Sequence, residues 1–455
     1  MTIQSINPAT GENIKSYTLH ADPEVSDKID QVHQAWLSWK ETSFEQRSTL
    51  LNKMAEVLIS RKDELAKLMA LEMGKPVTQG IAEVEKCAAV CRYYGDHAKD
   101  QLADMIIETE ASKSFVAFKP LGVVLAVMPW NYPFWQVFRF LAPALAAGNC
   151  GVLKHASNVP GCALAIEDVV KQAGLPEHVF KTLLISSQVV EKVIEHKHIK
   201  AVTLTGSNAA GSKVAQKAGE LIKKTVLELG GSDAYVVLED ADLDLAVKAC
   251  VDGRLLNSGQ SCIAAKRFIV VKPLIEQFTE KYIELMRAKI MGDPMDTKTE
   301  VGPQARIDLR NELHKQVTDS IKAGAVCKLG GKIPDEKTAF YTPTVLVNVK
   351  KGMPAFDEEL FGPVAAIIEA KDEAHAIELA NDSVFGLGGA VFTNDTKRGE
   401  HIAASLMQSG SCFVNAFVKS DPRLPFGGIK QSGYGRELSI FGIREFVNIK
   451  TVYIK

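Results

Sequence analysis

Hydrophobic and polar positions change their spacing along this chain, and each spacing predicts a type of element. Between residues 23 and 100, apolar positions recur three and four residues apart, as in LLNKMAEVLISRKDELAKLMALEMG. This spacing predicts helices. Gly74 and Pro76 are expected to end that helical run. From residue 121 onward, short continuous apolar runs alternate with helical stretches.

Five β-branched runs between residues 121 and 231 predict strands: LGVVLAVMP, GVLKHAS, KTLLISS, IKAVTLTGS and KKTVLELGG. The intervening stretches read as helices, so we predict a parallel, doubly wound α/β sheet. Such sheets bind ligands beyond the carboxyl ends of their strands. A second α/β series follows Gly231 and includes AYVVLED, DLDLAVKACVDGRLL, RFIVVKP, TPTVLVNV and GGAVFTND. We interpret the two series as two domains.

Two shorter pieces fit neither series. DMIIETEASKSFVAFK predicts a hairpin and FVNIKTVYIK a terminal strand. Both would expose an edge, and pairing with another subunit would protect it.

Length and composition narrow the function classes. One hydrophobic core stops growing at about 250–300 residues, so a chain of 455 residues is expected to hold at least two domains. The net charge of −2 gives no broad basic surface for nucleic acid or anionic lipid. We find no apolar run of about 18 residues and no apolar core of a signal peptide, so we expect no membrane span and a cytoplasmic location.

Eight cysteines in a chain of this length do not predict a disulfide framework. Cys87 and Cys91 lie four residues apart, but no nearby cluster completes a metal site, and we predict no metal. They are interpreted as core thiols, as are Cys150, Cys162, Cys250, Cys327 and Cys412. Cys262 differs because the polar run NSGQS precedes it. An accessible thiol there would be a strong nucleophile once ionised, whereas the alternative is a small buried side chain.

Two further side chains are candidates for chemistry. Glu228 ends the strand TVLEL before Gly230 and Gly231, where a carboxylate faces the ligand crevice; the alternative is a surface glutamate. Asn131 lies in the turn PWNYP, where its amide can donate to a developing oxyanion or cap a helix.

Trp135 and Arg139 share one face of the next predicted helix. A buried guanidinium needs a partner, which is either an internal carboxylate or that of a substrate. In LTGSNAAG, Gly206 and Ser207 precede a helix whose N-terminus can hold a phosphate, although this motif alone is weak. EELFGPV and PFGGIKQSGYGRE can be explained by turns with core phenylalanines.

Taken together, PWNYP, LTGS, ELGG, GQSC, EELFGPV and PFGGIKQSGYGRE follow one another in an order that resembles the aldehyde dehydrogenase superfamily, from NPATGE near residue 7 to the C-terminus. The resemblance implies a Rossmann-like cofactor domain (1–103 and 121–228), an α/β catalytic domain (229–435), and an oligomerisation arm with a C-terminal strand (104–120 and 436–455). It also implies a homodimer or a homotetramer.

The implied reaction oxidises an aldehyde to an acid with NAD or NADP. Cys262 matches the nucleophile that forms a thiohemiacetal and then a thioester. Asn131 matches the oxyanion donor, together with the Cys262 backbone N–H. Glu228 matches the base that activates water to hydrolyse the thioester.

The resemblance also assigns cofactor contacts, at Trp130, Lys154, Gly206, Ser207, Glu359 and Phe361. Family members that favour NAD often carry a glutamate three residues after the matching lysine, and this chain has Ser157 there. Because a serine does not repel a 2′-phosphate, we expect NADP to be preferred over NAD.

WQVFR, LKHASNVP and AAKRFIVV resemble the succinate-semialdehyde dehydrogenases, particularly a bacterial branch. Arg139 would then hold the substrate carboxylate, with Ser420 helping and Trp135 on the same helix face. Leu256 stands where many relatives have an arginine, which leaves other aldehydes open as substrates. A coenzyme A-acylating enzyme and a non-catalytic scaffold are the rival readings. Glu228 argues against the first, and intact Cys262, Glu228 and Asn131 argue against the second.

Overall fold

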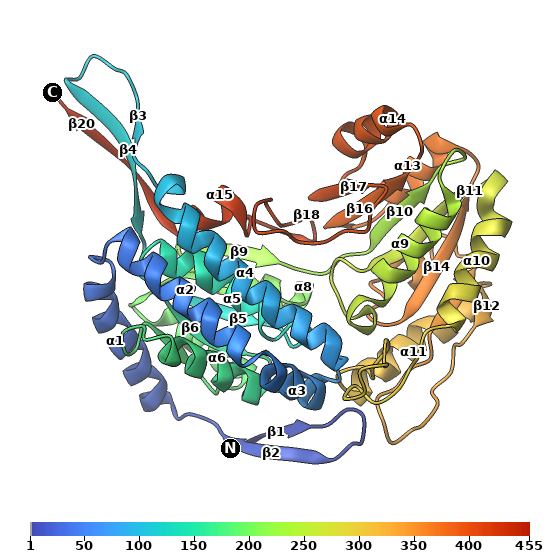
Figure 1. Cartoon of the computed structure of the whole chain (residues 1–455), viewed down its shortest axis with the longest axis horizontal. Coiled ribbons are helices and arrows are strands. Elements are labelled where there is room, and N and C mark those ends of the chain that lie inside the picture. Colours follow the sequence, from blue (N-terminus) through green and yellow to red (C-terminus); the bar gives the residue numbers. More distant parts are fainter. Residues whose placement is uncertain (1) are drawn as a thin grey trace.

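Two large sheets and one small three-stranded sheet organise the chain (Figure 1). The structure is a computed structural model and describes residues 2–455. Each large sheet is flanked by helices, and the small sheet projects from the first lobe as an arm that ends near the C-terminus.

The first large sheet has the strand order β19-β9-β8-β5-β6-β7. Its strands are β5 (Val123–Met128), β6 (Cys150–His155), β7 (Phe180–Thr182), β8 (Ile199–Thr205), β9 (Lys224–Glu228) and β19 (Gly433–Tyr434). The five strands predicted from the sequence are all present and parallel, while β19 joins β9 antiparallel. The connecting helices are α5 (Trp135–Ala146), α6 (Pro160–Gln172), η1 (Ser187–Val189), α7 (Val190–Glu195) and α8 (Asn208–Glu220).

The second large sheet has the order β12-β13-β14-β11-β10-β16-β17. Its strands are β10 (Asp233–Val237), β11 (Ala265–Val271), β12 (Val326–Leu329), β13 (Thr344–Val347), β14 (Val364–Ala370), β16 (Gly388–Phe392) and β17 (Ser411–Val414). Its helical segments are α9 (Leu243–Leu255), η2 (Leu256–Gly259), η3 (Lys272–Leu274), α10 (Ile275–Arg287), α11 (Ile307–Lys322), α12 (Pro354–Asp357), α13 (Glu373–Asn381), α14 (Thr396–His401) and η4 (Ile402–Leu406). A separate pair, β15 (Phe385–Gly386) and β18 (Ile429–Lys430), lies beside it.

The N-terminal region covers the first sheet with α1 (Asp22–Trp39), α2 (Phe44–Ser60), α3 (Lys62–Met73) and α4 (Val77–Gln101). Gly74 ends α3 with a φ of 76°, a left-handed conformation that suits glycine. The stretch before these helices forms the hairpin of β1 (Thr2–Ile6) and β2 (Asn13–Thr18).

The arm consists of β3 (Met105–Ile106), β4 (Lys113–Pro120) and β20 (Val447–Ile454), with β4 in the centre. The predicted hairpin and the predicted terminal strand therefore pair with each other along eight residues. No strand within residues 2–455 pairs with the outer edge of β20. The helix α15 (Ser439–Ile443) leads into this strand.

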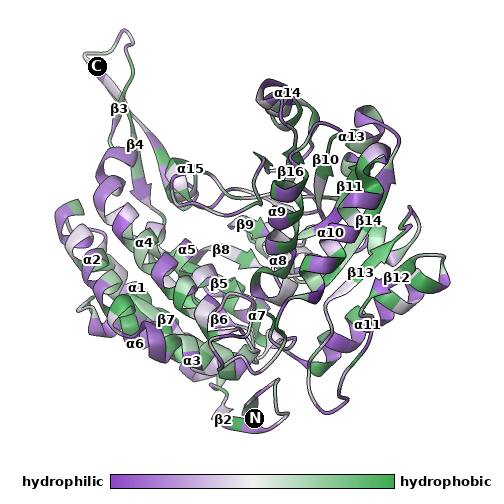
Figure 2. Ribbon diagram, turned by 45° about the vertical axis from the view of Figure 1, so that its right-hand side comes forward, coloured by the Kyte–Doolittle hydropathy of each residue, from purple (hydrophilic) through white to green (hydrophobic). Residues whose placement is uncertain are grey.

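The hydrophobic colour in Figure 2 gathers around the strands, and the hydrophilic colour lies on the outward sides of the helices. Strand β5 is almost fully buried, as parallel strands between two helix layers require. No helix within residues 2–455 is both long and apolar enough to cross a membrane.

Candidate active site

Cys262 follows an unusual backbone segment between α9 and β11. Asn257, Ser258 and Gly259 have consecutive positive φ values of 54°, 56° and 78°. A Cβ on Gly259 would lie 2.2 Å from the Gly362 carbonyl oxygen, so only glycine fits. This left-handed segment turns the chain sharply just before the cysteine. Specific contacts must offset the free-energy cost of its strained backbone.

Those contacts come from side chains of several elements. The Asn131 Nδ2 donates to the Gln260 carbonyl at 3.1 Å, and the Asn257 Nδ2 donates to the Asn131 carbonyl at 2.6 Å. The buried Lys266 Nζ donates to the carbonyl of Cys262 at 2.7 Å and to that of Ser261 at 2.9 Å. The cysteine loop and the Asn131 turn are thus fixed to each other.

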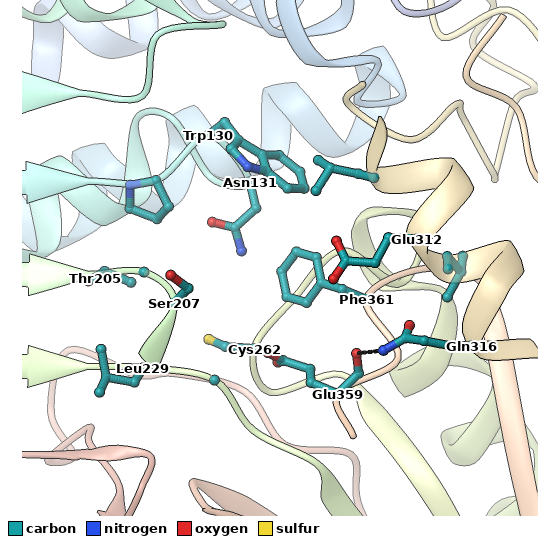
Figure 3. Close-up of a pocket in the computed structure, with 15 residues that line it drawn as sticks. Trp130, Asn131, Thr205, Ser207, Leu229, Cys262, Glu312, Gln316, Glu359 and Phe361 are labelled. Atoms are coloured by element: carbon teal, nitrogen blue, oxygen red, sulfur yellow. Dashed lines mark hydrogen bonds between the residues drawn. The ribbon is translucent and has the colours of Figure 1, made fainter. Parts of the chain in front are cut away.

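Two cavities share Cys262 as part of their walls. The first holds about 370 Å³ and is also lined by Trp130, Asn131, Gly206, Ser207, Glu359 and Phe361. The second holds about 170 Å³ and is also lined by Lys86, Trp135, Arg139, Lys419, Ser420 and Phe426. In Figure 3 the sulfur and the Asn131 amide both point into the first cavity. A group bound to the sulfur would therefore meet a ligand from either side.

Burial raises the pKa of the Cys262 thiol to about 12, while the positive charges of Arg139 and Lys266 oppose that shift. The thiol is therefore protonated near neutral pH in this arrangement, and it must lose its proton before it can attack.

Five of the seven predicted cofactor residues line the first cavity: Trp130, Gly206, Ser207, Glu359 and Phe361. Trp130 and Phe361 meet edge to face with their centroids 5.6 Å apart. Ser207 is the N-cap of α8, where its hydroxyl accepts from the Ala210 N–H at 3.3 Å. The positive end of α8 thus borders this cavity and suits a phosphate.

Two other helices that connect strands of the first sheet, α5 and α6, already have a carboxylate bound at the N-terminus. Glu83 accepts from the backbone N–H groups of Phe134 and Trp135 at 2.9 Å each, at the start of α5. Glu72 accepts from those of Gly161 and Cys162 at 2.9 Å each, at the start of α6. Of these three helices, only α8 offers its N-terminus to a ligand.

The remaining two predicted cofactor residues lie outside the first cavity. Ser157 is exposed and lines a separate cavity of about 380 Å³ beside the N-terminal hairpin and Arg306. Lys154 is buried at the end of β6, and burial lowers its pKa. Both residues stand at the carboxyl end of β6, on the ligand side of the sheet.

Glu228 lines neither of the two cavities that share Cys262. Both of its carboxylate oxygens are buried without a hydrogen-bond partner. A Cβ on Gly427 would lie 2.6 Å from Glu228 Oε1, so the glycine makes room for this carboxylate. Burial and the charge of Glu437 raise the pKa of Glu228 well above its usual range.

Arg139 has an internal carboxylate partner, one of the two alternatives left open by the sequence. It is ion-paired with the buried Glu437, and its guanidinium carbon lies 4.4 Å from the centroid of the Phe426 ring. Its Nη2 donates to Thr205 Oγ1 at 3.3 Å. Arg139 nevertheless lines the second cavity together with Trp135 and Ser420, the other two predicted substrate residues.

Sequence reasoning missed three charged residues of this region: Lys86, Lys266 and Glu437. Two of them could have been found from their sequence neighbours. Lys266 lies four residues after the nucleophile, and Glu437 ends the motif PFGGIKQSGYGRE. Lys86 had none, because it reads as a polar position of an amphipathic helix. Within residues 2–455, no group of three or more His, Cys, Asp or Glu side chains is placed to hold a metal ion.

Comparison with known proteins identifies a matching family, two relatives and a similar solved structure. The aldehyde dehydrogenase family matches residues 1–452. The chain is 50% identical over 454 residues to a probable succinate-semialdehyde dehydrogenase [NADP(+)] of Synechocystis, with 100% of both chains covered. It is 48% identical over 457 residues to succinate-semialdehyde dehydrogenase [NADP(+)] 1 of Mycobacterium tuberculosis, again with 100% of both covered.

Among solved structures, the chain is similar to succinic semialdehyde dehydrogenase from Streptococcus pyogenes in complex with NADP+ as the cofactor. The two are 37% identical, the match covers 99% of each chain, and the TM-score is 0.97.

Proposed function

The chain belongs to the aldehyde dehydrogenase family, and we propose that it oxidises succinate semialdehyde to succinate with NADP. One observation carries the proposal: Cys262 lies in the wall between a cavity with a helix N-terminus and a cavity lined by three cations. The first suits a phosphate-bearing cofactor, and the second suits an aldehyde that carries a carboxylate. The relatives named as succinate-semialdehyde dehydrogenases support this choice of substrate.

Cys262 is the nucleophile in the proposed mechanism. After its thiol proton passes to solvent, the sulfur attacks the aldehyde carbon and forms a C–S bond, while the carbonyl π bond breaks and its oxygen becomes an oxyanion. The Asn131 Nδ2 has a second hydrogen beyond the one given to Gln260, and it donates that hydrogen to the oxyanion with the Cys262 backbone N–H. Lys266 keeps this geometry by holding the Cys262 carbonyl.

When held in the first cavity by residues such as Trp130 and Ser207, NADP would supply the acceptor for the hydride that leaves the substrate carbon. Cys262 then carries the acyl group as a thioester, and water must attack it. Glu228 accepts a proton from that water, for which its carboxylate must turn from the space beside Gly427 toward the sulfur. Because Glu228 provides a base that activates water, we expect the acyl group to be released by hydrolysis and not transferred to coenzyme A.

The cofactor preference follows from the end of β6. Ser157 is exposed and uncharged, so it leaves room for a 2′-phosphate and can donate a hydrogen bond to it. Lys154 adds a positive charge on the same side. We therefore propose that NADP is used in preference to NAD.

A direct test compares succinate semialdehyde with butyraldehyde, which differs mainly in lacking the carboxylate, each with NADP and with NAD. We expect kcat/KM to be highest for succinate semialdehyde with NADP, and Cys262→Ser to abolish turnover. Equal oxidation of both aldehydes would overturn the substrate assignment. Reduction of NADP only when coenzyme A is added would overturn hydrolysis.

The arm supports a homodimer or a homotetramer. Ile449 is 62% exposed and Ile106 is 64% exposed, and no strand of the described chain pairs with the outer edge of β20. A second copy of the chain would cover both the apolar side chains and the strand edge. Sedimentation at several protein concentrations tests this assembly.

All eight cysteines are free, and a catalytic thiol requires a reducing compartment, so we propose a cytoplasmic location.

A further inference from the structure

Two of the cations that line the second cavity, Lys86 and Lys419, have no ion-pair partner within residues 2–455, and Lys86 is the less exposed of the two. Lys86 projects from α4 into this cavity, and its Nζ donates to Ser420 Oγ at 2.6 Å. The same nitrogen lies 4.2 Å from the centroid of the Trp135 ring. The ammonium group is thus held between α5 and the loop that follows β17.

The charges around this cavity are unevenly compensated. Arg139 is neutralised by Glu437, and Glu83 is paired with the buried Lys75. Lys419 is exposed to solvent. Lys86 forms no ion pair with any residue of the described chain. Burial and the charge of Arg139 lower the pKa of Lys86 to about 8. Keeping an ammonium group in such a place is costly unless an anion joins it.

Resting on the proposed function, we propose that Lys86 and Ser420 bind the carboxylate of the substrate, and that Lys86 supplies the charge that selects an acidic aldehyde. The ammonium group has three N–H donors. One is used by Ser420, another faces the Trp135 ring, and the third is free for a carboxylate oxygen. Because the Ser420 hydroxyl accepts from Lys86, its own hydrogen is free to donate to the same carboxylate.

This assignment changes the role expected for Arg139. Its charge is already balanced by Glu437, so it adds little net attraction for an anion. Lys86 instead provides a charge with no ion-pair partner within residues 2–455, in a cavity that also reaches Cys262. Selection of the carboxylate is therefore expected to depend more on Lys86 than on Arg139.

The first experiment compares Lys86→Met with Lys62→Met, a matched control on α3 whose lysine pairs with Glu85 at the surface. We expect Lys86→Met to lower kcat/KM for succinate semialdehyde by about 10- to 100-fold, the usual value of a hydrogen bond between charged groups. The loss should lie mainly in KM and should be much smaller for butyraldehyde. The control should match the wild type on both. Equal losses on both aldehydes would mean that Lys86 is only structural.

A pH profile provides a second readout that does not depend on Lys86→Met folding well. The titratable and charged groups facing Lys86 are Glu83 and Cys87 on its own helix, Arg139 on α5, and Lys419 and Asp421 on the loop. Dividing kcat/KM for succinate semialdehyde by that for butyraldehyde cancels the titration of Cys262 and Glu228. The ratio should fall as the pH rises through about 8, because the ammonium form is lost.

Lys86→Arg keeps its charge at high pH, so its ratio should stay constant to about pH 10. A ratio that falls equally in the wild type and in this variant would overturn the role of Lys86. If the wild type shows no preference for succinate semialdehyde at any pH, the proposed substrate itself fails. If it shows the preference and Lys86→Met keeps it, only the assignment of Lys86 fails.

Discussion

Arg139 of α5 is ion-paired with Glu437 of the C-terminal segment, and burial together with the charge of Glu437 raises the pKa of Glu228. The residue that the sequence assigned to the substrate is therefore connected to the residue assigned to water activation. Replacing Arg139 would disturb both.

We predict that Arg139→Ala lowers kcat for butyraldehyde as well as for succinate semialdehyde. The variant leaves Glu437 buried and unpaired, which raises the pKa of Glu228 further. The double variant Arg139→Ala with Glu437→Gln should recover much of the butyraldehyde activity, since no unpaired charge remains. Steady-state kinetics on both aldehydes checks this, and full butyraldehyde activity in the single variant would contradict it.

Glu437→Gln should shift the acid limb of the kcat profile to lower pH. A neutral amide no longer raises the pKa of Glu228, while Arg139 still lowers it, so the active carboxylate form persists in more acidic solution. The profile should be measured where hydrolysis limits turnover. An unchanged acid limb would show that Glu228 and Glu437 titrate independently.

Glu228→Gln separates the two halves of the reaction. Without the base, Cys262 should still form the thioester and release about one equivalent of NADPH per site. The following steady state should be slower by about 10²- to 10⁴-fold, the usual contribution of a general base. Rapid mixing monitored by NADPH absorbance shows the burst. If no burst forms, Glu228 is needed before hydride transfer.

Ser157→Glu should reverse the cofactor preference. A carboxylate at this exposed position repels the 2′-phosphate of NADP and accepts hydrogen bonds from the ribose of NAD. The ratio of kcat/KM for NADP to that for NAD should fall by at least about tenfold, as expected for a charge-assisted contact. Ser157→Ala is the matched control and should change the ratio much less.

Glu83→Ala should destabilise the fold far more than Glu85→Ala, two residues away. Glu83 is buried against Lys75 and accepts two backbone N–H groups of α5, and removing one member of a buried pair costs about 3–5 kcal/mol. Glu85 pairs with Lys62 at the surface, where such a pair contributes about 0–1 kcal/mol. Thermal unfolding of the two variants compares them, and similar midpoints would contradict the prediction.

Local pattern was enough to predict the sheet that holds the cofactor side of the site. The runs around β5, β6, β8 and β9 are continuous and apolar because helices cover both faces, and this signal needs no distant residue. The run KTLLISS was only partly correct, since β7 ends at Thr182. Cys262 and Asn131 were identified from their own loops, and the structure brings those loops together. Their catalytic roles, and that of Glu228, stay predictions.

Partners from distant parts of the chain could not be predicted in the same way. The sequence left open whether Arg139 meets an internal carboxylate, because Glu437 reaches it only after the C-terminal segment returns to the first sheet through β19. Lys86 likewise meets Trp135 and Ser420 only when α4 packs on α5 beside the loop that follows β17. Periodicity assigns a position to a helix face but does not say what covers that face.

The shared wall at Cys262 also bears on the order of events during turnover. Once the acyl group is attached to the sulfur, it fills the aldehyde side, while the reduced cofactor still lies on the other side of Cys262. Under the proposed function, the reduced cofactor can depart before hydrolysis, and water can enter the volume that it vacates. The two products then leave in sequence, the reduced cofactor first and the acid after hydrolysis, from the two cavities that share Cys262.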